Sequence, residues 1–163
     1  MSAGVLIAGI GNIFLSDDGF GVEVAERLAR RELPEGVLLR EFGIRGIHLA
    51  YELLNGFDVL LLIDAVPHNE EPGTLSVIEP DPDDLAERAG AALDAHTMDP
   101  ATVLATLHSI GGRVERVTIL GCQPASLEEG IGLTPEVAAA VEPAVEMCID
   151  LASNLARGKG TAA

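Results

Sequence analysis

The sequence predicts an α/β protein: a single domain with three α/β/α layers around a mostly parallel, twisted sheet of about five strands. Short apolar runs that suit strands buried on both faces alternate with amphipathic segments that suit helices. The chain has 163 residues, the size of one domain, and 48% hydrophobic residues are enough for a sizeable core. No internal repeat or linker divides it. We therefore expect residues 1–163 to form one domain, whose last residues are a disordered tail.

The first strand and helix are expected at the start of the chain. Residues 5–8 are a continuous apolar run that leads into the glycine-rich turn 9–12, a pattern typical of a buried strand. Ser16 is a candidate N-cap for a helix that runs to about Arg31. The acidic residues that follow Ser16 would lie in the first helical turn, where the helix dipole favours negative charge.

Two further strands follow this helix. Residues 35–42 predict a strand that ends at the turn 43–46, and a short helix then extends to about Asn55. Residues 57–63 form the most strongly apolar strand, and Asp64 closes it.

The second half is expected to contain one more α/β unit and a C-terminal helix. The expected elements are a strand that could lie at the sheet edge, a helix, a strand and a final helix, at residues 73–78, 102–110, 117–120 and from 134 onward. Residues 79–99 are acidic and lack a clear period, so we expect a loop with a brief helical turn near Leu85. This loop carries His96. Pro143 should kink the last helix, because proline lacks an N–H and clashes with the preceding turn.

Charge and composition exclude several classes of function. A formal charge of −16 argues against partners that are nucleic acids or anionic membrane surfaces, since both require basic patches. No basic leader opens the chain, and no apolar run approaches the ~18 residues of a membrane span. Cys122 and Cys148 form neither a C-x-x-C pair nor a disulfide framework, so we expect small buried apolar residues. The expectation is a soluble cytoplasmic protein.

A nucleotide site has to be considered, because Gly9-Ile10-Gly11 stands between a strand and a helix. The dinucleotide fingerprint requires a third glycine where this chain has Phe14. Asp17 and Asp18 would also repel a pyrophosphate at the helix start. Glu41 resembles the ribose-binding acid of such sites, but one matching feature does not restore the motif. We therefore expect no nucleotide cofactor.

Three side chains are candidates for a metal site: Asp18, Asp64 and His96. Each follows a predicted strand or lies on a loop beyond one, and α/β sheets gather ligands at the carboxyl ends of their strands. Two carboxylates and one imidazole suit a divalent transition ion. Each residue also has a simpler interpretation: Asp18 could serve the helix dipole, Asp64 could cap a turn, and His96 could be polar surface. On spacing alone, His68 is as good a candidate as His96.

No nucleophile signature accompanies these residues. The chain has no G-x-S-x-G motif, and neither cysteine lies in an evident strand-to-helix elbow. A hydrolase of this kind would have to use water or a group bound to its substrate.

The chain resembles the hydrogenase maturation proteases, the endopeptidases that trim the C-terminal extension of the nickel–iron hydrogenase large subunit. Four segments in order carry the resemblance. They are G-I-G-N-I-F-L-S-D-D-G-F-G at 9–21, L-L-L-I-D-A-V at 60–66 with P-G-T-L at 72–75, A-H-T-M at 95–98, and G-C-Q-P-A-S-L-E-E-G-I-G-L-T-P-E-V at 121–137. The ordered combination is specific, although each piece alone would be weak.

The resemblance implies a site and a mechanism. It implies that Asp18, Asp64 and His96 form the metal site, with Asp18 and Asp64 catalytic, and it favours His96 over His68. It also implies a metal-dependent endopeptidase that acts on a precursor already loaded with nickel, so that the nickel comes with the substrate.

Two departures from the family pattern are visible. Asp18 stands where glutamate is frequent, and residues 41–46 replace an Asp-Gly-Gly-Thr-type turn. We expect that turn to tune which large subunit is recognised. The alternative function is a non-catalytic metal-binding maturation chaperone on the same scaffold.

Overall fold

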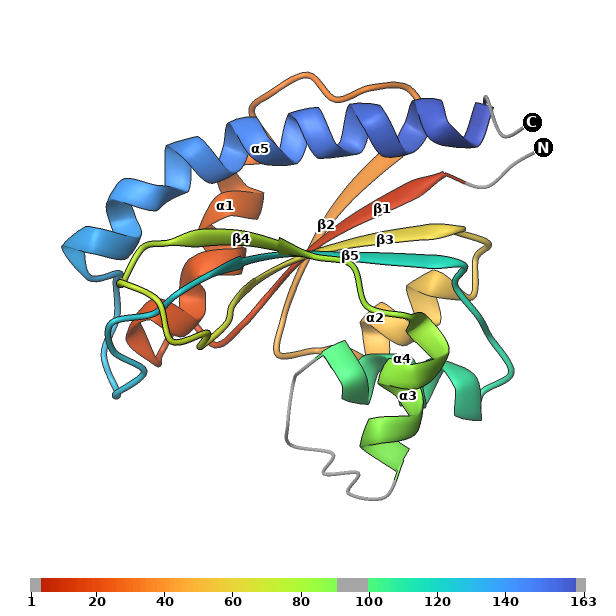
Figure 1. The fold of residues 1–163 in the computed structure, drawn as a ribbon, viewed down its shortest axis with the longest axis horizontal. Coiled ribbons are helices and arrows are strands. Elements are labelled where there is room, and N and C mark those ends of the chain that lie inside the picture. Colours follow the sequence, from red (N-terminus) through yellow and green to blue (C-terminus); the bar gives the residue numbers. More distant parts are fainter. Residues whose placement is uncertain (1–3, 91–99, 161–163) are drawn as a thin grey trace.

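The computed structural model describes residues 4–90 and 100–160 and shows one α/β domain with a five-stranded sheet (Figure 1). The strand order is β2-β1-β3-β5-β4. The strands are β1 Val5–Ile10, β2 Val37–Gly43, β3 Val59–Ala65, β4 Leu75–Ile78 and β5 Arg116–Cys122. The helices are η1 Ser16–Gly19, α1 Phe20–Leu28, α2 Gly46–Leu53, α3 Pro82–Gly90, α4 Pro100–Ser109 and α5 Pro135–Gly160, of which η1 is a 3-10 turn. The predicted fold class is confirmed.

Four of the five strands are parallel, as the apolar runs predicted. β1 pairs with both β2 and β3, β3 pairs with β5, and every residue of β1 and β3 is buried. Only β4 is antiparallel, and it forms the edge of the sheet beside β5. The predicted edge strand over 73–78 is therefore confirmed.

Two hydrophobic cores lie on the two faces of the sheet. Alternate residues of a strand point to opposite faces, so Val5 and Ile7 contact the core under α1 and α5, whereas Leu6 and Ala8 contact the core under α2, α3 and α4. Figure 1 shows these two helical layers on either side of the sheet. No helix among the described residues is both long and apolar enough to cross a bilayer.

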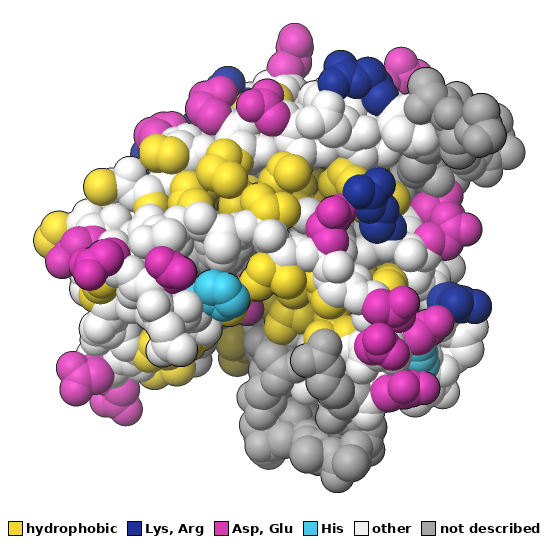
Figure 2. Space-filling model, in the orientation of Figure 1, with side chains coloured by type: hydrophobic (Ala, Val, Ile, Leu, Met, Phe, Trp, Pro, Cys, Tyr) yellow, Lys and Arg dark blue, Asp and Glu magenta, His cyan; other side chains and the backbone are white. Residues whose placement is uncertain are grey.

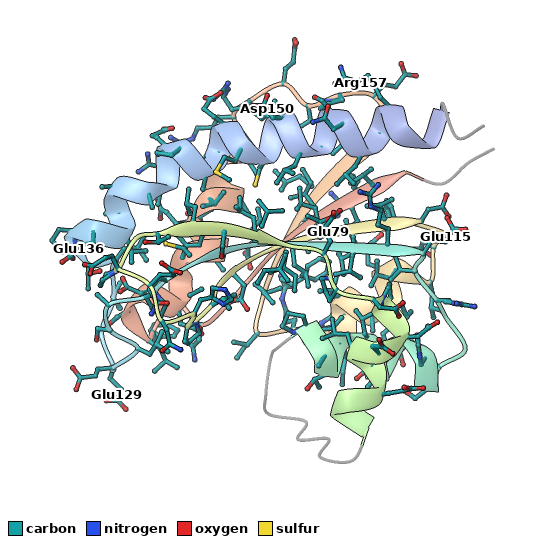
Figure 3. The ribbon with its side chains drawn as sticks, in the orientation of Figure 1. Glu79, Glu115, Glu129, Glu136, Asp150 and Arg157 are labelled. Carbon is teal, nitrogen blue, oxygen red and sulfur yellow. The ribbon has the colours of Figure 1, made fainter. Side chains whose placement is uncertain are left out.

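Acidic side chains and an apolar band both lie on the face of the molecule shown in Figure 2. Figure 3 shows Glu115 and Asp150 at the periphery of the molecule, and both are exposed. An apolar band lies between α5 and the edge strand β4 (Figure 2), where Leu75 and Pro143 line a shallow groove. The acidic charge is thus spread over the exterior around an apolar interior.

Helix α1 approaches the sheet closely because it carries a glycine at the point of contact. A Cβ at Gly21 would overlap the carbonyl oxygens of Ile63 and Ile10, and would lie 2.9 Å from the carbonyl carbon of Ile63. A Cβ at Gly9 would meet the Cβ of Ala25 at 2.8 Å. These glycines let η1, which directly precedes α1, lie against the ends of β1 and β3.

Two local predictions were wrong. Ser16 is not an N-cap: it has φ 53°, its hydroxyl donates to the carbonyl of Glu128, and the α-helix begins only at Phe20 and ends at Leu28 rather than Arg31. The segment 79–99, expected to be a loop with a brief turn, contains α3. The Asp81 carboxylate accepts the N–H groups of Asp83 and Asp84, which caps this helix.

The C-terminal helix begins where the Thr134-Pro135 pair predicted. The carbonyl of Thr134 accepts the N–H of Ala138 at 2.8 Å. The helix does not end at Pro143 but continues to Gly160.

Candidate active site

Asp64 closes the central strand β3 at its carboxyl end. It pairs in register with Gly121 of β5, and its exposed fraction is only 7%. A carboxylate this deeply buried requires hydrogen bonds, a counter-charge or a metal ion, because desolvating an uncompensated charge is costly. Its burial therefore favours a functional role for the Asp64 carboxylate over that of an ordinary surface charge.

Asp18 lies on η1, just beyond the carboxyl end of the neighbouring strand β1. Its Oδ2 accepts the N–H of Asn12 at 2.7 Å, which orients the half-buried carboxylate. Gly11 adopts φ 134°, and a side chain there would collide with the backbone oxygen of Asp18. Since η1 contacts β3, the fold brings Asp18 and Asp64 to the same edge of the sheet.

The third candidate, His96, lies outside the described residues. Among residues 4–90 and 100–160, no group of three His, Cys, Asp or Glu side chains could hold a metal ion. His68, the other candidate on spacing, is exposed, and its backbone N–H donates to the side-chain oxygen of Gln123. The metal role of the trio stays a prediction.

Asp17 has a role that the sequence did not indicate. We expected a first-turn carboxylate that serves the helix dipole, but Asp17 is fully buried and its carboxylate faces the loop before α5. Burial acts to raise its pKa, but the N–H groups of Thr134, Ser126 and Ala125 and the hydroxyl of Thr134 outweigh that effect, so its pKa lies below the ordinary value. Asp17 is therefore held as a buried anion.

The loop before α5 is tied to the turn that carries Asp18. The N–H of Ser16 donates to the carbonyl of Gly130 at 2.9 Å, and the N–H of Gly130 donates to the carbonyl of Phe14 at 2.9 Å. Phe14 and Ile131 are 60% and 81% exposed, so the joined loops present apolar side chains close to Asp18.

The two cysteines are buried and unsuited to nucleophilic chemistry. Burial, with a smaller contribution from the charge of Asp17, raises the pKa of the Cys122 thiol to about 11. Burial alone raises that of Cys148 to about 12. Because the thiolate is the reactive form, both groups are inert near neutral pH. The expectation of small buried residues is confirmed.

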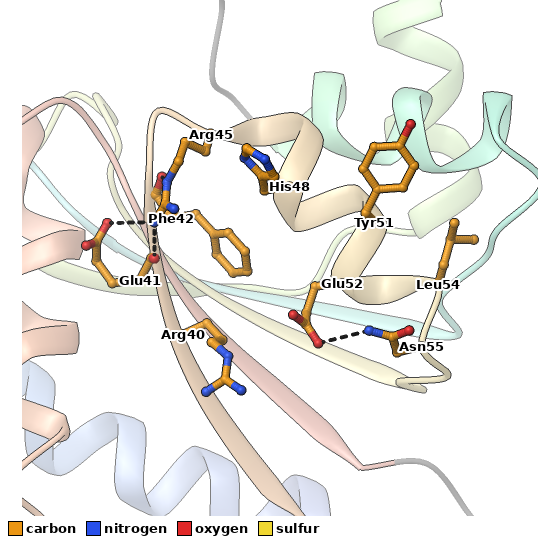
Figure 4. A pocket seen from close by; sticks show the side chains of 9 residues that line it. All are labelled: Arg40, Glu41, Phe42, Arg45, His48, Tyr51, Glu52, Leu54 and Asn55. Carbon is orange, nitrogen blue, oxygen red and sulfur yellow. Dashed lines mark hydrogen bonds and ion pairs between the residues drawn. The ribbon is translucent and has the colours of Figure 1, made fainter.

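A groove of about 630 Å³ opens beside the end of β2 (Figure 4). Its lining includes Arg45, His48 and Tyr51. The Arg45 guanidinium donates to the carbonyls of Phe42 and Glu41, at 3.1 and 2.9 Å, and so stabilises its own turn. The N–H of Gly11 donates to the carbonyl of Gly43, which connects this turn to the loop beneath Asp18.

Fold and site together define an α/β domain with carboxylates at the ends of parallel strands, and comparison with known proteins identifies its class. A model of the hydrogenase maturation protease family matches residues 22–151. The chain is 33% identical over 147 residues to the hydrogenase 2 maturation protease of Escherichia coli K12, covering 89% of this chain and 88% of that protein. It is 34% identical over 148 residues to the hydrogenase expression/formation protein HupD of Rhizobium leguminosarum, covering 89% and 72%.

Solved structures agree with this assignment. The hydrogenase maturating endopeptidase HybD from E. coli superposes with a TM-score of 0.77 at 32% identity, over 93% of each chain. The maturation protease HybD from Thermococcus kodakarensis superposes with a TM-score of 0.70 at 28% identity, over 91% of this chain and 99% of that one. The chain belongs to the hydrogenase maturation protease family. The prediction of a hydrogenase-processing endopeptidase is confirmed, in preference to the non-catalytic chaperone.

Proposed function

We propose that this endopeptidase removes the C-terminal extension of a nickel–iron hydrogenase large-subunit precursor after nickel insertion. The nickel, held by the precursor's cysteines, is the recognition handle. Asp18, Asp64 and His96 then complete the coordination of that ion. The observation that carries the proposal is the placement of Asp18 and Asp64 at one sheet edge, on the adjoining elements η1 and β3.

The chemistry of these residues fits hydrolysis without a protein nucleophile. A metal ion can polarise the scissile carbonyl or activate a water molecule, and a carboxylate can instead act as a general base. In each case water adds to the carbonyl carbon, the C–N bond breaks, and the released amine takes a proton. The inert thiols of Cys122 and Cys148 support a water-based route over a covalent thioester.

The environment of Asp18 supports a role in engaging an ion carried by another polypeptide. Its carboxylate is oriented by the Asn12 N–H yet remains only half-buried, so it can be reached from outside. The exposed side chains of Phe14 and Ile131 on the adjoining loops offer apolar contacts to the incoming chain. A site that binds a metal ion carried by its substrate requires ligands that are already oriented before the substrate binds. The hydrogen bond from the Asn12 N–H orients the Asp18 carboxylate in this way.

We assign selection among large subunits to the turn 41–46 and the groove beside it. The turn stands where the family pattern differs from this chain, and Arg45 fixes its conformation through the carbonyls of Phe42 and Glu41. Tyr51 and His48 place aromatic and polar groups in the groove (Figure 4). Because Gly43 is hydrogen-bonded to Gly11, a polypeptide in the groove would lie near the proposed site.

The test is incubation of the protein with a nickel-loaded precursor, followed by intact mass measurement. Loss of a C-terminal peptide from the loaded precursor, with no loss from a nickel-free precursor, is the expected result. Equal cleavage of both precursors would contradict the nickel handle. Binding of the loaded precursor without any cleavage would contradict the proposed hydrolysis.

A further inference from the structure

Asp17 is a buried carboxylate that the proposed chemistry does not use. It adjoins Asp18 in η1 and is 0% exposed. Its Oδ2 accepts the N–H groups of Ala125 and Ser126, at 2.8 and 3.0 Å, and its Oδ1 accepts the N–H of Thr134 at 2.7 Å. The Thr134 hydroxyl lies 3.0 and 2.9 Å from the two oxygens. One side chain thus contacts both ends of the loop 125–134.

These hydrogen bonds connect segments that are distant in sequence and do not cap the helix to which Asp17 belongs. The partners lie 108, 109 and 117 residues further along the chain. The Asp17 N–H also donates to the carbonyl of Ser126 at 3.1 Å, so backbone and side chain both hold the same loop. Neither η1 nor α1 has a side-chain N-cap. The loop before α5 therefore supplies the anchoring that the turn lacks locally.

The anchoring fixes the position of Asp18. A 3-10 turn of four residues has few internal hydrogen bonds, so external contacts determine where its side chains point. We propose that Asp17 is a positioning residue of the proteolytic site: it clamps η1 to the loop 125–134 and thereby presents Asp18 at the edge where Asp64 lies. This inference rests on the proposed role of Asp18.

Asparagine at position 17 removes the clamp with little change in volume. The amide retains one acceptor oxygen but turns an NH₂ donor toward the backbone N–H groups that Asp17 now satisfies. Some of the three N–H groups are then left without an acceptor, and the attachment of the loop to η1 is weakened to its backbone hydrogen bonds and the Ser16 hydroxyl. Because the carboxylate of Asp18 is bound to the Asn12 N–H, that amide proton reports the position of Asp18 independently of catalysis.

The experiment compares Asp17→Asn with the wild-type protein by ¹⁵N NMR in the free state and by processing of the nickel-loaded precursor. We expect the Asn12 amide to shift upfield and to exchange about tenfold faster, the size expected for one lost hydrogen bond. We expect kcat/KM to fall by about 10- to 100-fold, the cost of a misplaced reacting group. Circular dichroism at the assay temperature establishes that the variant is folded.

Leu155→Ala is the matched control, because it destabilises the hydrophobic core under α1 and α5 at a position on α5 that is far from Thr134. It should lower the melting temperature while leaving the Asn12 amide and kcat/KM unchanged. Thr134→Val, which removes only the hydroxyl donor, should shift the Asn12 amide in the same direction by less, and it replaces Asp17→Asn as the test if that variant does not fold.

If the chemical shift and the exchange rate of the Asn12 amide are unchanged in folded Asp17→Asn, the proposed clamping role of Asp17 is overturned. A fall in kcat/KM that Leu155→Ala reproduces overturns it as well. If Asp18→Asn processes precursor normally, the proposed function fails instead, whereas the amide measurement still decides whether Asp17 positions Asp18.

Discussion

Replacing Gly21 with alanine should disrupt the junction that carries Asp18 to the sheet. The added methyl would overlap the carbonyl oxygens of Ile63 and Ile10 and lie 2.9 Å from the carbonyl carbon of Ile63. Ordinary van der Waals contacts lie at 3.4–4 Å, and the obstructing atoms belong to the backbone of the central strands. Helix α1 must therefore move away from the sheet by about 1 Å, since the strands cannot yield.

The size of the effect follows from two opposing contributions. Overpacking a close contact costs about 1–3 kcal/mol, and a rigid backbone obstacle favours the upper end. Alanine gains up to about 1 kcal/mol over glycine in a helix. The net loss of unfolding free energy should be about 2 kcal/mol. Because η1 directly precedes α1, precursor processing should also fall, by about 10- to 100-fold.

Urea unfolding measures the loss of stability, and Gly158→Ala is its control. Nothing lies within 4 Å of a Cβ built at Gly158, which is exposed near the end of α5. The control should be neutral or slightly stabilising. A Gly21→Ala protein as stable as wild type, or an equal loss in Gly158→Ala, would refute the close-approach reasoning.

Three other perturbations test separate parts of the account. Replacing both Cys122 and Cys148 with alanine should leave processing at a substantial level, because their raised pKa values of about 11 and about 12 keep the thiols protonated; abolished turnover in a folded double variant would indicate thiol catalysis. The same raised pKa values make the free energy of unfolding depend on pH. The contribution of each thiol is fully present below the ordinary pKa of 9.0 and is lost as pH rises toward the folded pKa values. The loss should be about 1 kcal/mol per thiol near pH 10. Urea titrations should show this loss between about pH 8 and about pH 10 in the wild type and not in the double variant. Calorimetry with ATP or NAD should detect no micromolar binding, because the half-buried Asp18 carboxylate places negative charge at the turn after β1, where phosphates would lie; measurable affinity would contradict this. Tyr51→Ala in the groove should change the relative kcat/KM for two different precursors by about 10-fold or more, the effect of losing an exposed aromatic side chain that a bound precursor would cover; an equal effect on both would count against selection by the groove.

The sequence was sufficient to predict the sheet and to place two of the candidate metal ligands, Asp18 and Asp64, at one edge of it. Continuous apolar runs at β1 and β3 indicate strands buried on both faces, and such strands are parallel. Parallel strands bring their carboxyl ends to one edge, so the sequence alone predicts that Asp18 and Asp64 lie together. The local sequence pattern was enough to predict these strands because burial of each strand on both faces is recorded in its own run of apolar residues.

The sequence was insufficient where distant segments determine a contact, and where a helix is polar on average. Helix α3 is amphipathic but polar on average, so its few apolar residues gave only a faint signal, although the Asp81-Pro82 pair is a recognisable start signal. Asp17 looked like a helix-dipole residue because its actual partners lie more than a hundred positions away. No spacing rule links a carboxylate at 17 to the amides of 125, 126 and 134, so that contact could only be found in the folded chain.

The central claim, that one shared ion is engaged by Asp18, Asp64 and His96, is tested most directly by precursor processing in Asp64→Asn. This variant keeps the volume and removes the charge. Processing, followed by mass spectrometry, should fall by about 100-fold or more, beyond the usual cost of losing a residue that only orients a ligand. Asp18→Asn and His96→Ala should show the same loss, because ligands of a shared site act as a unit. His68→Ala, an exposed histidine whose backbone rather than its ring contacts Gln123, should process normally. Normal processing by Asp64→Asn, or a loss in His68→Ala equal to that in His96→Ala at unchanged thermal stability, would contradict the account.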